Sequence, residues 1–229
     1  MNMKLQRTLK LVLKPTEEQK QLLLKTLEQY KFAYNYTCKI AWETETWSGV
    51  QLHKLTYCTV RNRTSLSSQL VVSARVVATE SLKSAINRKK KGLKSRCPES
   101  NNPAIRYDKR SYTLWLNREE VPLATVSGRQ RFKVKIPEYF KQYLGWKITS
   151  ANLKYDKRLK KFFLNITVEK DFSDIEPIDF YVGVDLGLRK LAVVSTPDGK
   201  INKFFDGGHI RAVSERYYAL RKRLQSKFT

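Results

Sequence analysis

The chain has 229 residues, of which 41% are apolar and 11% aromatic, so a packed core is expected and gross disorder is not. Lysine and arginine number 45 against 21 acids, which gives a formal charge of +24. A cation surplus of this size favours a partner with dense negative charge, and nucleic acid is the commonest one. An anionic membrane surface is the rival, but no apolar run approaches the roughly 18 residues that a spanning helix needs.

Cysteine and histidine give no sign of a metal or disulfide framework. Cys38, Cys58 and Cys97 are odd in number, far apart in the sequence and without CxxC spacing, so we expect no disulfide framework and no zinc site within this chain. His53 and His209 are isolated from each other. No signal peptide opens the sequence, and we expect a cytoplasmic protein with reduced thiols.

The first elements are a strand and a long helix. Residues 4–13 alternate basic and apolar side chains, which predicts a strand with one solvated face. Thr16 and Gln19 have the spacing of a capping box and predict the start of a helix that extends to about Thr46. Its expected buried stripe is Leu23, Leu27, Tyr30, Tyr34, Cys38 and Ala41.

Two further helices are predicted over residues 51–62 and 66–91. The second ends in a basic run, with seven cations and no acid between Lys83 and Arg96. Cations at a helix C-terminus suit the macrodipole, but seven exceed what a cap needs. We therefore favour a phosphate-contacting edge at Arg88, Lys89, Lys90 and Lys91.

From residue 105 onward the pattern changes to short strands, which predicts a small antiparallel barrel. Its candidate RNA-binding cations are Arg129, Arg131, Lys133, Lys135, Lys157 and Arg158. Aromatic residues are interleaved with them, namely Tyr107, Tyr112, Trp115, Phe132, Tyr155 and Phe162. Unpaired RNA bases stack on rings while phosphates meet cations, although most of these rings are expected in the barrel core.

Residues 180–205 predict three strands, of which the first ends at Asp185. An acid at the carboxyl end of a buried strand is costly to desolvate unless it is paired or holds a metal. Gly183 and Gly187 leave room for close approach of another group. The alternative is an ordinary hairpin with a capping aspartate.

The last predicted helix, residues 209–227, is basic, with candidate nucleic-acid contacts at Arg216, Arg221 and Arg223. Its expected buried stripe is Ile210, Val213, Tyr217, Leu220 and Leu224.

Several motifs together resemble the TnpB family, the transposon-encoded RNA-guided DNA endonucleases, also described as OrfB-type transposase-associated proteins and related to compact type V CRISPR effectors. The matching motifs are Gly183-Val184-Asp185-Leu186-Gly187, Leu191-Ala192-Val193, Asp198-Gly199, the pattern from Glu215 to Leu224, and Leu66, Ser68 and Gln69. The resemblance implies an α+β fold. Residues 1–15 and 93–172 would form a small antiparallel wedge β-barrel, 16–92 an inserted helical recognition lobe, 173–179 a linker, and 180–229 the incomplete start of a ribonuclease-H-like RuvC α/β domain.

The same resemblance implies a function and its residues. The family binds a guide RNA and a double-stranded DNA target beside a short flanking motif, and its RuvC domain cleaves DNA with Mg²⁺. Asp185 would be a catalytic metal ligand, Ser68 and Gln69 would contact the flanking duplex, and the arginines of the last helix would lie near the guide–target heteroduplex. A prokaryotic, nucleoid-associated protein is implied.

The sequence departs from the family pattern after Asp185. A second catalytic Glu, a four-cysteine zinc ribbon and a third catalytic Asp do not occur before Thr229. One Asp cannot hold two Mg²⁺ ions. We therefore expect no DNA cleavage by this chain alone, and a carboxy-terminal polypeptide would have to complete the site. The alternatives are a repressor-like nucleic-acid-binding protein without chemistry and, less favoured, an actin-like ATPase.

Overall fold

The computed structural model describes residues 3–108, 110–114, 118–143, 145–172, 181–187 and 190–226. Contacts divide the chain into two units, residues 1–173 and 174–229, and each is described by itself. The predicted linker, residues 173–179, and Trp115 lie outside the described residues. The division of the chain into four segments stays a prediction.

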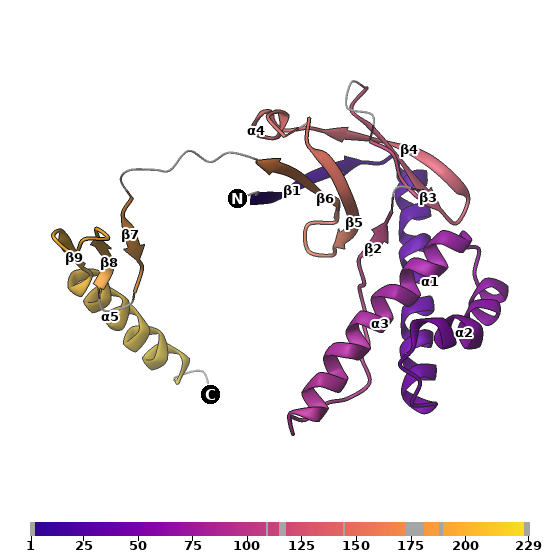
Figure 1. Ribbon diagram of the computed structural model, residues 1–229, viewed down its shortest axis with the longest axis horizontal. Helices are drawn as coiled ribbons and strands as arrows, with labels where there is room; N and C mark the ends of the chain where they lie inside the picture. Colours follow the sequence, from indigo (N-terminus) through magenta and orange to yellow (C-terminus); the bar gives the residue numbers. More distant parts are fainter. Residues whose placement is uncertain are drawn as a thin grey trace. The chain divides into compact units, whose positions relative to one another are not determined.

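The first unit contains a six-stranded antiparallel sheet that curls into a nearly closed barrel (Figure 1). Its strands are β1 (Met3–Lys14), β2 (Ile105–Tyr107), β3 (Glu120–Thr125), β4 (Gly128–Lys135), β5 (Lys147–Asp156) and β6 (Lys161–Phe172), in the order β2-β5-β6-β1-β4-β3. Contacts join the two end strands, β2 and β3. The Tyr107 hydroxyl on β2 donates a hydrogen bond to the Ala124 carbonyl on β3 at 3.0 Å, and Tyr112, after β2, forms an isolated β-bridge with Leu123 of β3. The predicted small antiparallel barrel is therefore present.

Alternation of side chains fills this barrel. Leu9, Leu11 and Leu13 of β1 are buried while Lys10 between them is exposed, as the predicted period of two requires. Of the six interleaved aromatics, Tyr107, Tyr112, Phe132 and Phe162 are buried in the core. Tyr155 is half-buried against it. These rings stabilise the barrel and are not available for stacking on RNA bases.

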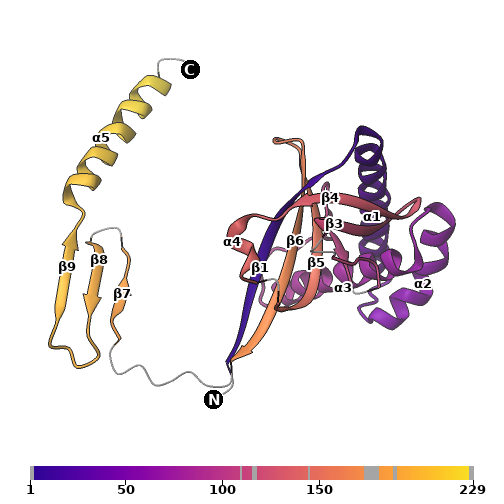
Figure 2. The ribbon, with the colours of Figure 1, turned by 90° about the horizontal axis from the view of Figure 1, so that it is seen from above.

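Three helices are inserted between β1 and β2, namely α1 (Glu17–Glu43), α2 (Gly49–Arg63) and α3 (Ser68–Lys90). They lie together on one side of the barrel, next to β2 and β3 (Figures 1 and 2). The capping box predicted at Thr16 and Gln19 is confirmed, and the predicted stripe of α1 is buried throughout. The helix ends at Glu43, slightly before the predicted end.

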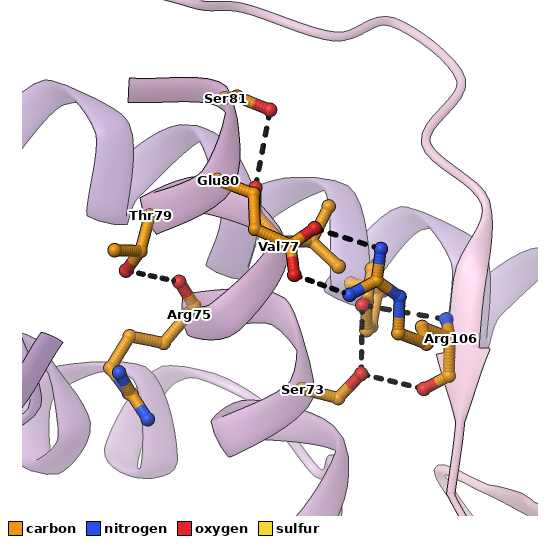
Figure 3. Close-up of polar contacts among 8 residues, drawn as sticks. Ser73, Arg75, Val77, Thr79, Glu80, Ser81 and Arg106 are labelled. Atoms are coloured by element: carbon orange, nitrogen blue, oxygen red, sulfur yellow. Dashed lines mark hydrogen bonds and ion pairs between the residues drawn. The ribbon is translucent and has the colours of Figure 1, made fainter. Parts of the chain in front are cut away.

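A polar network joins the helices to the barrel (Figure 3). The Ser73 hydroxyl on α3 donates to the Arg106 carbonyl on β2 at 2.6 Å and lies 3.1 Å from the Tyr30 hydroxyl of α1. The Arg106 guanidinium forms two hydrogen bonds with the Glu80 carboxylate, at 2.8 and 2.9 Å. These bonds lower the pKa of Glu80, and the bidentate geometry fixes α3 against β2.

Glu169 forms a second polar anchor, on β6. Its carboxylate accepts from Lys147 at 2.9 Å and from Gln6 at 3.2 Å, and Lys4 lies 3.6 Å away. The hydrogen bond from Lys147, followed by that from Gln6, lowers the pKa of Glu169. A carboxyl whose pKa is lower in the folded than in the unfolded state adds stability above its unfolded pKa, and this stability is lost as pH falls through the folded pKa.

The variant Glu169→Gln is therefore expected to melt below wild type at pH 7, with a gap in Tm that narrows as pH falls towards 3. Thermal melting followed by circular dichroism across this range measures the gap. Glu28→Gln is a matched control, because Glu28 is exposed on α1 and forms no ion pair within the described part of the chain. A difference in Tm between wild type and Glu169→Gln that stays constant at every pH would contradict the role of the ionised Glu169 carboxylate in stability.

The second unit is a three-stranded antiparallel sheet followed by a helix: β7 (Gly183–Asp185), β8 (Lys190–Ser195), β9 (Asn202–Asp206) and α5 (Gly208–Gln225). The three predicted strands are present, and Gly199, in the turn between β8 and β9, has a φ of +69°. Each described helix of the chain is too short or too polar to cross a lipid bilayer.

Two burial predictions for this unit are wrong. The expected apolar stripe of α5 is exposed, with Ile210 58% and Tyr217 67% accessible. The strand that ends at Asp185 is exposed as well, and Val184 is 58% accessible. The reason is that three short strands and one helix do not enclose a core of their own.

Candidate nucleic-acid interface

The outer face of the barrel carries a row of cations that β1 and β4 form together. Strand pairing places Lys14 directly opposite Lys133 and Val12 opposite Lys135, and all three lysines are exposed. Like charges directly across a strand pair are destabilising. Lys10 continues the row along β1, with its ammonium group 4.1 Å from the Phe163 ring centroid. We call Lys10, Lys14, Lys133 and Lys135 the basic face.

Sequence reasoning found two members of the basic face and missed the other two. Lys133 and Lys135 were predicted as contacts, whereas Lys10 was assigned only to a solvated strand face and Lys14 was placed after the predicted strand. The missed signal is long-range pairing, because only the register of β1 with β4 shows that the four lysines share one surface. The alternation of lysines with buried leucines along β1 is the sequence signal that could have indicated a shared basic surface.

The other predicted barrel cations lie at strand ends and turns. Arg129 and Arg131 are exposed on β4. The Arg129 guanidinium donates to the Arg110 carbonyl, and the Arg131 carbonyl accepts from Gln19 at 2.9 Å. Lys157 and Arg158 are exposed in the turn between β5 and β6. The structure therefore leaves the charged ends of this last pair accessible to a polyanion.

The start of α3 is arranged differently from the prediction for a DNA contact. Ser67, not Ser68, caps the helix, and its hydroxyl accepts from the Leu70 amide at 3.4 Å. Ser68 is exposed, while the Gln69 amide donates to the Asp108 carboxylate. Asp108 also accepts from the backbone amides of Arg110 and Ser111 at 3.0 Å. Gln69 is thus already used to hold α3 against the loop after β2, and its role with DNA stays a prediction.

The basic end of α3 borders a hollow. Arg88, Lys89, Lys90 and Lys91 are all exposed in the last turn and at the C-cap. Arg88 also lines a hollow of about 780 Å³ together with Lys94, Arg96, Ser81, Ser84 and Ser95, and one acid, Glu99, lines it as well. This grouping of cations and hydroxyls suits a phosphate group.

The cysteines are closer in space than their sequence spacing suggests. The Cys97 thiol lies 3.5 Å from the Cys38 carbonyl oxygen, so the loop after α3 packs on α1. Burial raises the pKa of Cys38 to about 12, which keeps it a neutral thiol at physiological pH. All three cysteines are free, and Cys38 is best described as a packing residue.

Asp185 stands at the carboxyl end of β7, opposite Val193 of β8, with an exposed side chain. Within the described part of the second unit it forms no ion pair, whereas the other acids do. Asp206 pairs with Lys190 at 2.8 Å, Glu215 with Arg211 at 2.7 Å, and Asp198 with Lys200 at 3.6 Å. Among the described acids of this unit, Asp185 is thus the one whose carboxylate is not neutralised by a neighbouring cation.

A carboxylate oxygen is the ligand type that Mg²⁺ prefers. Among the described residues, however, no three His, Cys, Asp or Glu side chains gather in a way that could hold a metal ion. Asp185 therefore fits as one ligand but does not form a metal site with the residues described around it. Three predicted cations of this unit, Arg216, Arg221 and Arg223, are exposed on α5.

Comparison with known proteins bears on these surfaces. The family model of the OrfB/IS605 helix-turn-helix domain matches residues 1–41, which cover β1 and most of α1. Among solved structures, the chain is similar to a CRISPR-Cas12f ternary complex (TM-score 0.50, 12% identity, 93% of this chain and 53% of that chain). It is also similar to a Cas12f1–sgRNA–target DNA complex (TM-score 0.55, 12% identity, 93% of this chain and 55% of that chain).

The family model covers 41 of the 229 residues, so membership of the TnpB family stays a prediction. At 12% identity the likeness to Cas12f shows a shared fold. The chain spans about half the length of these solved relatives, at 53% and 55%. A comparison with the curated proteins gives no match. The activity and partners of a whole protein are therefore matters for proposal.

Proposed function

We propose that this chain belongs to the TnpB family and is the amino-terminal part of an RNA-guided DNA endonuclease of a transposon. In this proposal it binds a guide RNA and a DNA duplex next to a short flanking motif, in the cytoplasm at the nucleoid. The observation that carries the proposal is the basic face, on which Lys14 stands opposite Lys133. Glu120 of β3 lies across from Lys133 on its other side, so the four lysines of this face outnumber the one acid that the strand register places beside them. A polyanion such as RNA relieves that repulsion when it binds.

The two Cas12f structures support the same reading, since they are a ternary complex and a complex with sgRNA and target DNA. Those partners belong to Cas12f, and their transfer to this chain is part of the proposal. The basic face and the turn at Lys157 and Arg158 would contact RNA phosphates. The basic end of α3, with Ser68, would contact the DNA duplex, and the α5 arginines would contact the guide–target heteroduplex.

The proposed chemistry is hydrolysis of DNA at a RuvC-type site in which Asp185 supplies one Mg²⁺ ligand. The other ligands would come from a carboxy-terminal polypeptide. Asp185 would hold Mg²⁺ together with those other ligands, and the bound ion would supply activation of water and stabilisation of the leaving oxygen. By itself, the 229-residue chain is expected to leave matched DNA uncut in the presence of Mg²⁺ and guide RNA.

A binding protein without chemistry, such as a repressor, is the competing candidate. The unpaired Asp185 carboxylate argues against it, because a protein that only binds nucleic acid gains nothing from an exposed acid. Under the repressor reading, Asp185→Ala would strengthen nucleic-acid binding by removing a repulsive charge. If the protein is a nuclease, Mg²⁺ bound at Asp185 would offset that repulsion in the wild type. Wild type and Asp185→Ala would then bind nucleic acid with similar affinity once Mg²⁺ is added.

RNA affinity is expected to fall steeply with salt. If the basic face and its neighbours contact about five phosphates, affinity for an RNA hairpin falls about 10²-fold between 50 and 200 mM KCl. Fluorescence anisotropy with a labelled RNA from the transposon end measures the slope. The double variant Lys133→Ala/Lys135→Ala is expected to reduce the slope of log K against log salt by about 1.4.

The double variant Lys25→Ala/Lys54→Ala is the matched control, because it removes the same charge from exposed positions on α1 and α2. It is expected to leave the slope within about 0.3 of wild type. An equal reduction by both pairs would mean that RNA responds to net charge alone, and the basic face would lose its assigned role.

A further inference from the structure

A run of aromatic rings follows β4. Tyr139 lies on the short helix α4 (Glu138–Lys141), and its ring centroid is 5.9 Å from that of Tyr143. Tyr143 is 5.1 Å from Trp146, which is 5.9 Å from Phe172 at the end of β6. All three contacts are edge-to-face, and the Tyr139 and Tyr143 hydroxyls are 3.2 Å apart. We call Tyr139, Tyr143, Trp146 and Phe172 the aromatic strip.

The strip lies where the inner face of the barrel opens to solvent. On β6 the buried residues are Phe162, Leu164, Ile166 and Val168, and the same alternation continues to Lys170 and Phe172. On β1, Arg7 lies on the same face of the strand as the buried leucines. It is opposite Val168 of β6, and its side chain is exposed. Arg7 and Lys170 thus point from the barrel's inner face at the end that carries the strip.

These two cations are available to a ligand. Among the residues that the structure describes, neither Arg7 nor Lys170 is paired with an acid. The nearby acids already have partners, since Glu138 pairs with Lys141 at 2.7 Å and Glu169 with Lys147 at 2.9 Å. The Lys170 ammonium group lies 5.3 Å from the Phe172 ring centroid.

Tyr139 is the member of the strip that offers a free ring face. It is 65% exposed, whereas Tyr143 and Trp146 are half-buried and packed on the barrel core. The Tyr143 hydroxyl is 3.2 Å from the Tyr139 hydroxyl, and this hydrogen bond raises the pKa of Tyr139. Tyr139 is thus an exposed ring that is held by Tyr143, at the end of the barrel from which Arg7 and Lys170 project.

We propose that the aromatic strip is a stacking site for an unpaired nucleotide. The base stacks on the Tyr139 ring, and the adjoining phosphate contacts Arg7 and Lys170. This inference rests on the proposed function, because it names the part of a nucleic acid that one surface of the same protein takes. Stacking needs only the π-face of a base, so the site is tolerant of sequence and requires a single-stranded nucleotide. A duplex keeps its bases stacked on each other and offers the strip only phosphates.

The test uses the full chain and 12-nucleotide single strands that contain one 2-aminopurine, as RNA and as DNA of the same sequence. Stacking on Tyr139 is expected to quench the 2-aminopurine fluorescence, and titration gives the affinity. Tyr139→Leu keeps an apolar side chain but removes the ring, and it is expected to weaken single-strand binding about tenfold. Tyr139→Phe keeps the ring and is expected to stay within about twofold of wild type.

Two controls make the result specific. Tyr181→Leu removes a tyrosine that is exposed to a similar degree, 63%, outside the strip, and its affinity is expected to match wild type. A duplex RNA of equal length is expected to bind wild type and Tyr139→Leu equally. If Tyr139→Leu weakens binding of the RNA strand, of the DNA strand or of both, the stacking site is supported. The affected strand identifies the nucleic acid that the site binds.

Failure of this inference is separable from failure of the proposed function. If wild type binds the strands and Tyr139→Leu binds them equally well, the strip is not a stacking site, while the salt-dependent basic face stands. If wild type binds neither strand nor duplex, both the strip and the proposed function are overturned.

Discussion

Changing Asp185 to asparagine is expected to abolish DNA cleavage once the site is complete. The substitution keeps the shape of the side chain but removes the negative oxygen that a divalent metal binds. Loss of a group that only orients a metal ligand costs 10- to 100-fold, so loss of the ligand itself should cost at least about 10²-fold in rate. The measurement is cleavage of guide-matched plasmid DNA with Mg²⁺, in an assembly of this chain with the carboxy-terminal polypeptide.

Asp198→Asn is the matched control in the same sheet. The Asp198 carboxylate accepts from the Thr196 hydroxyl at 2.6 Å and pairs with Lys200, so it is committed to its turn. Its variant is expected to cleave at nearly the wild-type rate, and Asp185→Asn is expected to retain RNA affinity within about twofold. Undiminished cleavage by Asp185→Asn would refute the assignment of this residue as a metal ligand.

Phe132→Ala is expected to have the largest effect on stability. The ring is fully buried in the barrel, where β4 pairs with β3 at Val121. Removing a buried phenyl group loses its transfer free energy and leaves a cavity, which lowers the free energy of unfolding by about 3–5 kcal/mol. In a protein of this size that corresponds to a fall in Tm of roughly 10 °C.

Lys133→Ala, one residue further along β4, separates folding from binding. Its side chain points to the opposite face of the strand and is exposed, so its Tm is expected to stay close to that of wild type. The same variant is expected to weaken RNA binding. Adjacent positions would thus affect different properties, and a similar fall in Tm for both would contradict the proposed orientation of β4.

Local chemistry explains which parts of the fold were predictable. The capping box at Thr16 and Gln19 and the period-two burial of Leu9, Leu11 and Leu13 depend on near neighbours. Both were therefore predictable from the sequence. The buried aromatics of the barrel follow the same rule, since Phe132 alternates with exposed lysines along β4.

Long-range contacts explain what was missed. The bond from Gln69 to Asp108 joins residues 39 positions apart, and no local pattern indicates that this amide is already occupied. The joining of Lys14 with Lys133 depends in the same way on strand order. For α5, periodicity correctly located an apolar stripe, but it does not indicate which residues cover that stripe. The described residues of the second unit leave the stripe exposed.

The pairing of β1 with β6 determines when the first unit can fold during synthesis. Met3 is opposite Phe172 and Val12 opposite Phe163, so the opening strand must wait for the ribosome to add about 160 residues before its main partner exists. At a synthesis rate of about 5–20 residues per second this interval is on the order of ten seconds. Throughout it, a leucine-rich strand emerges without its principal neighbour, which makes the nascent chain a natural client for a chaperone that binds extended apolar segments.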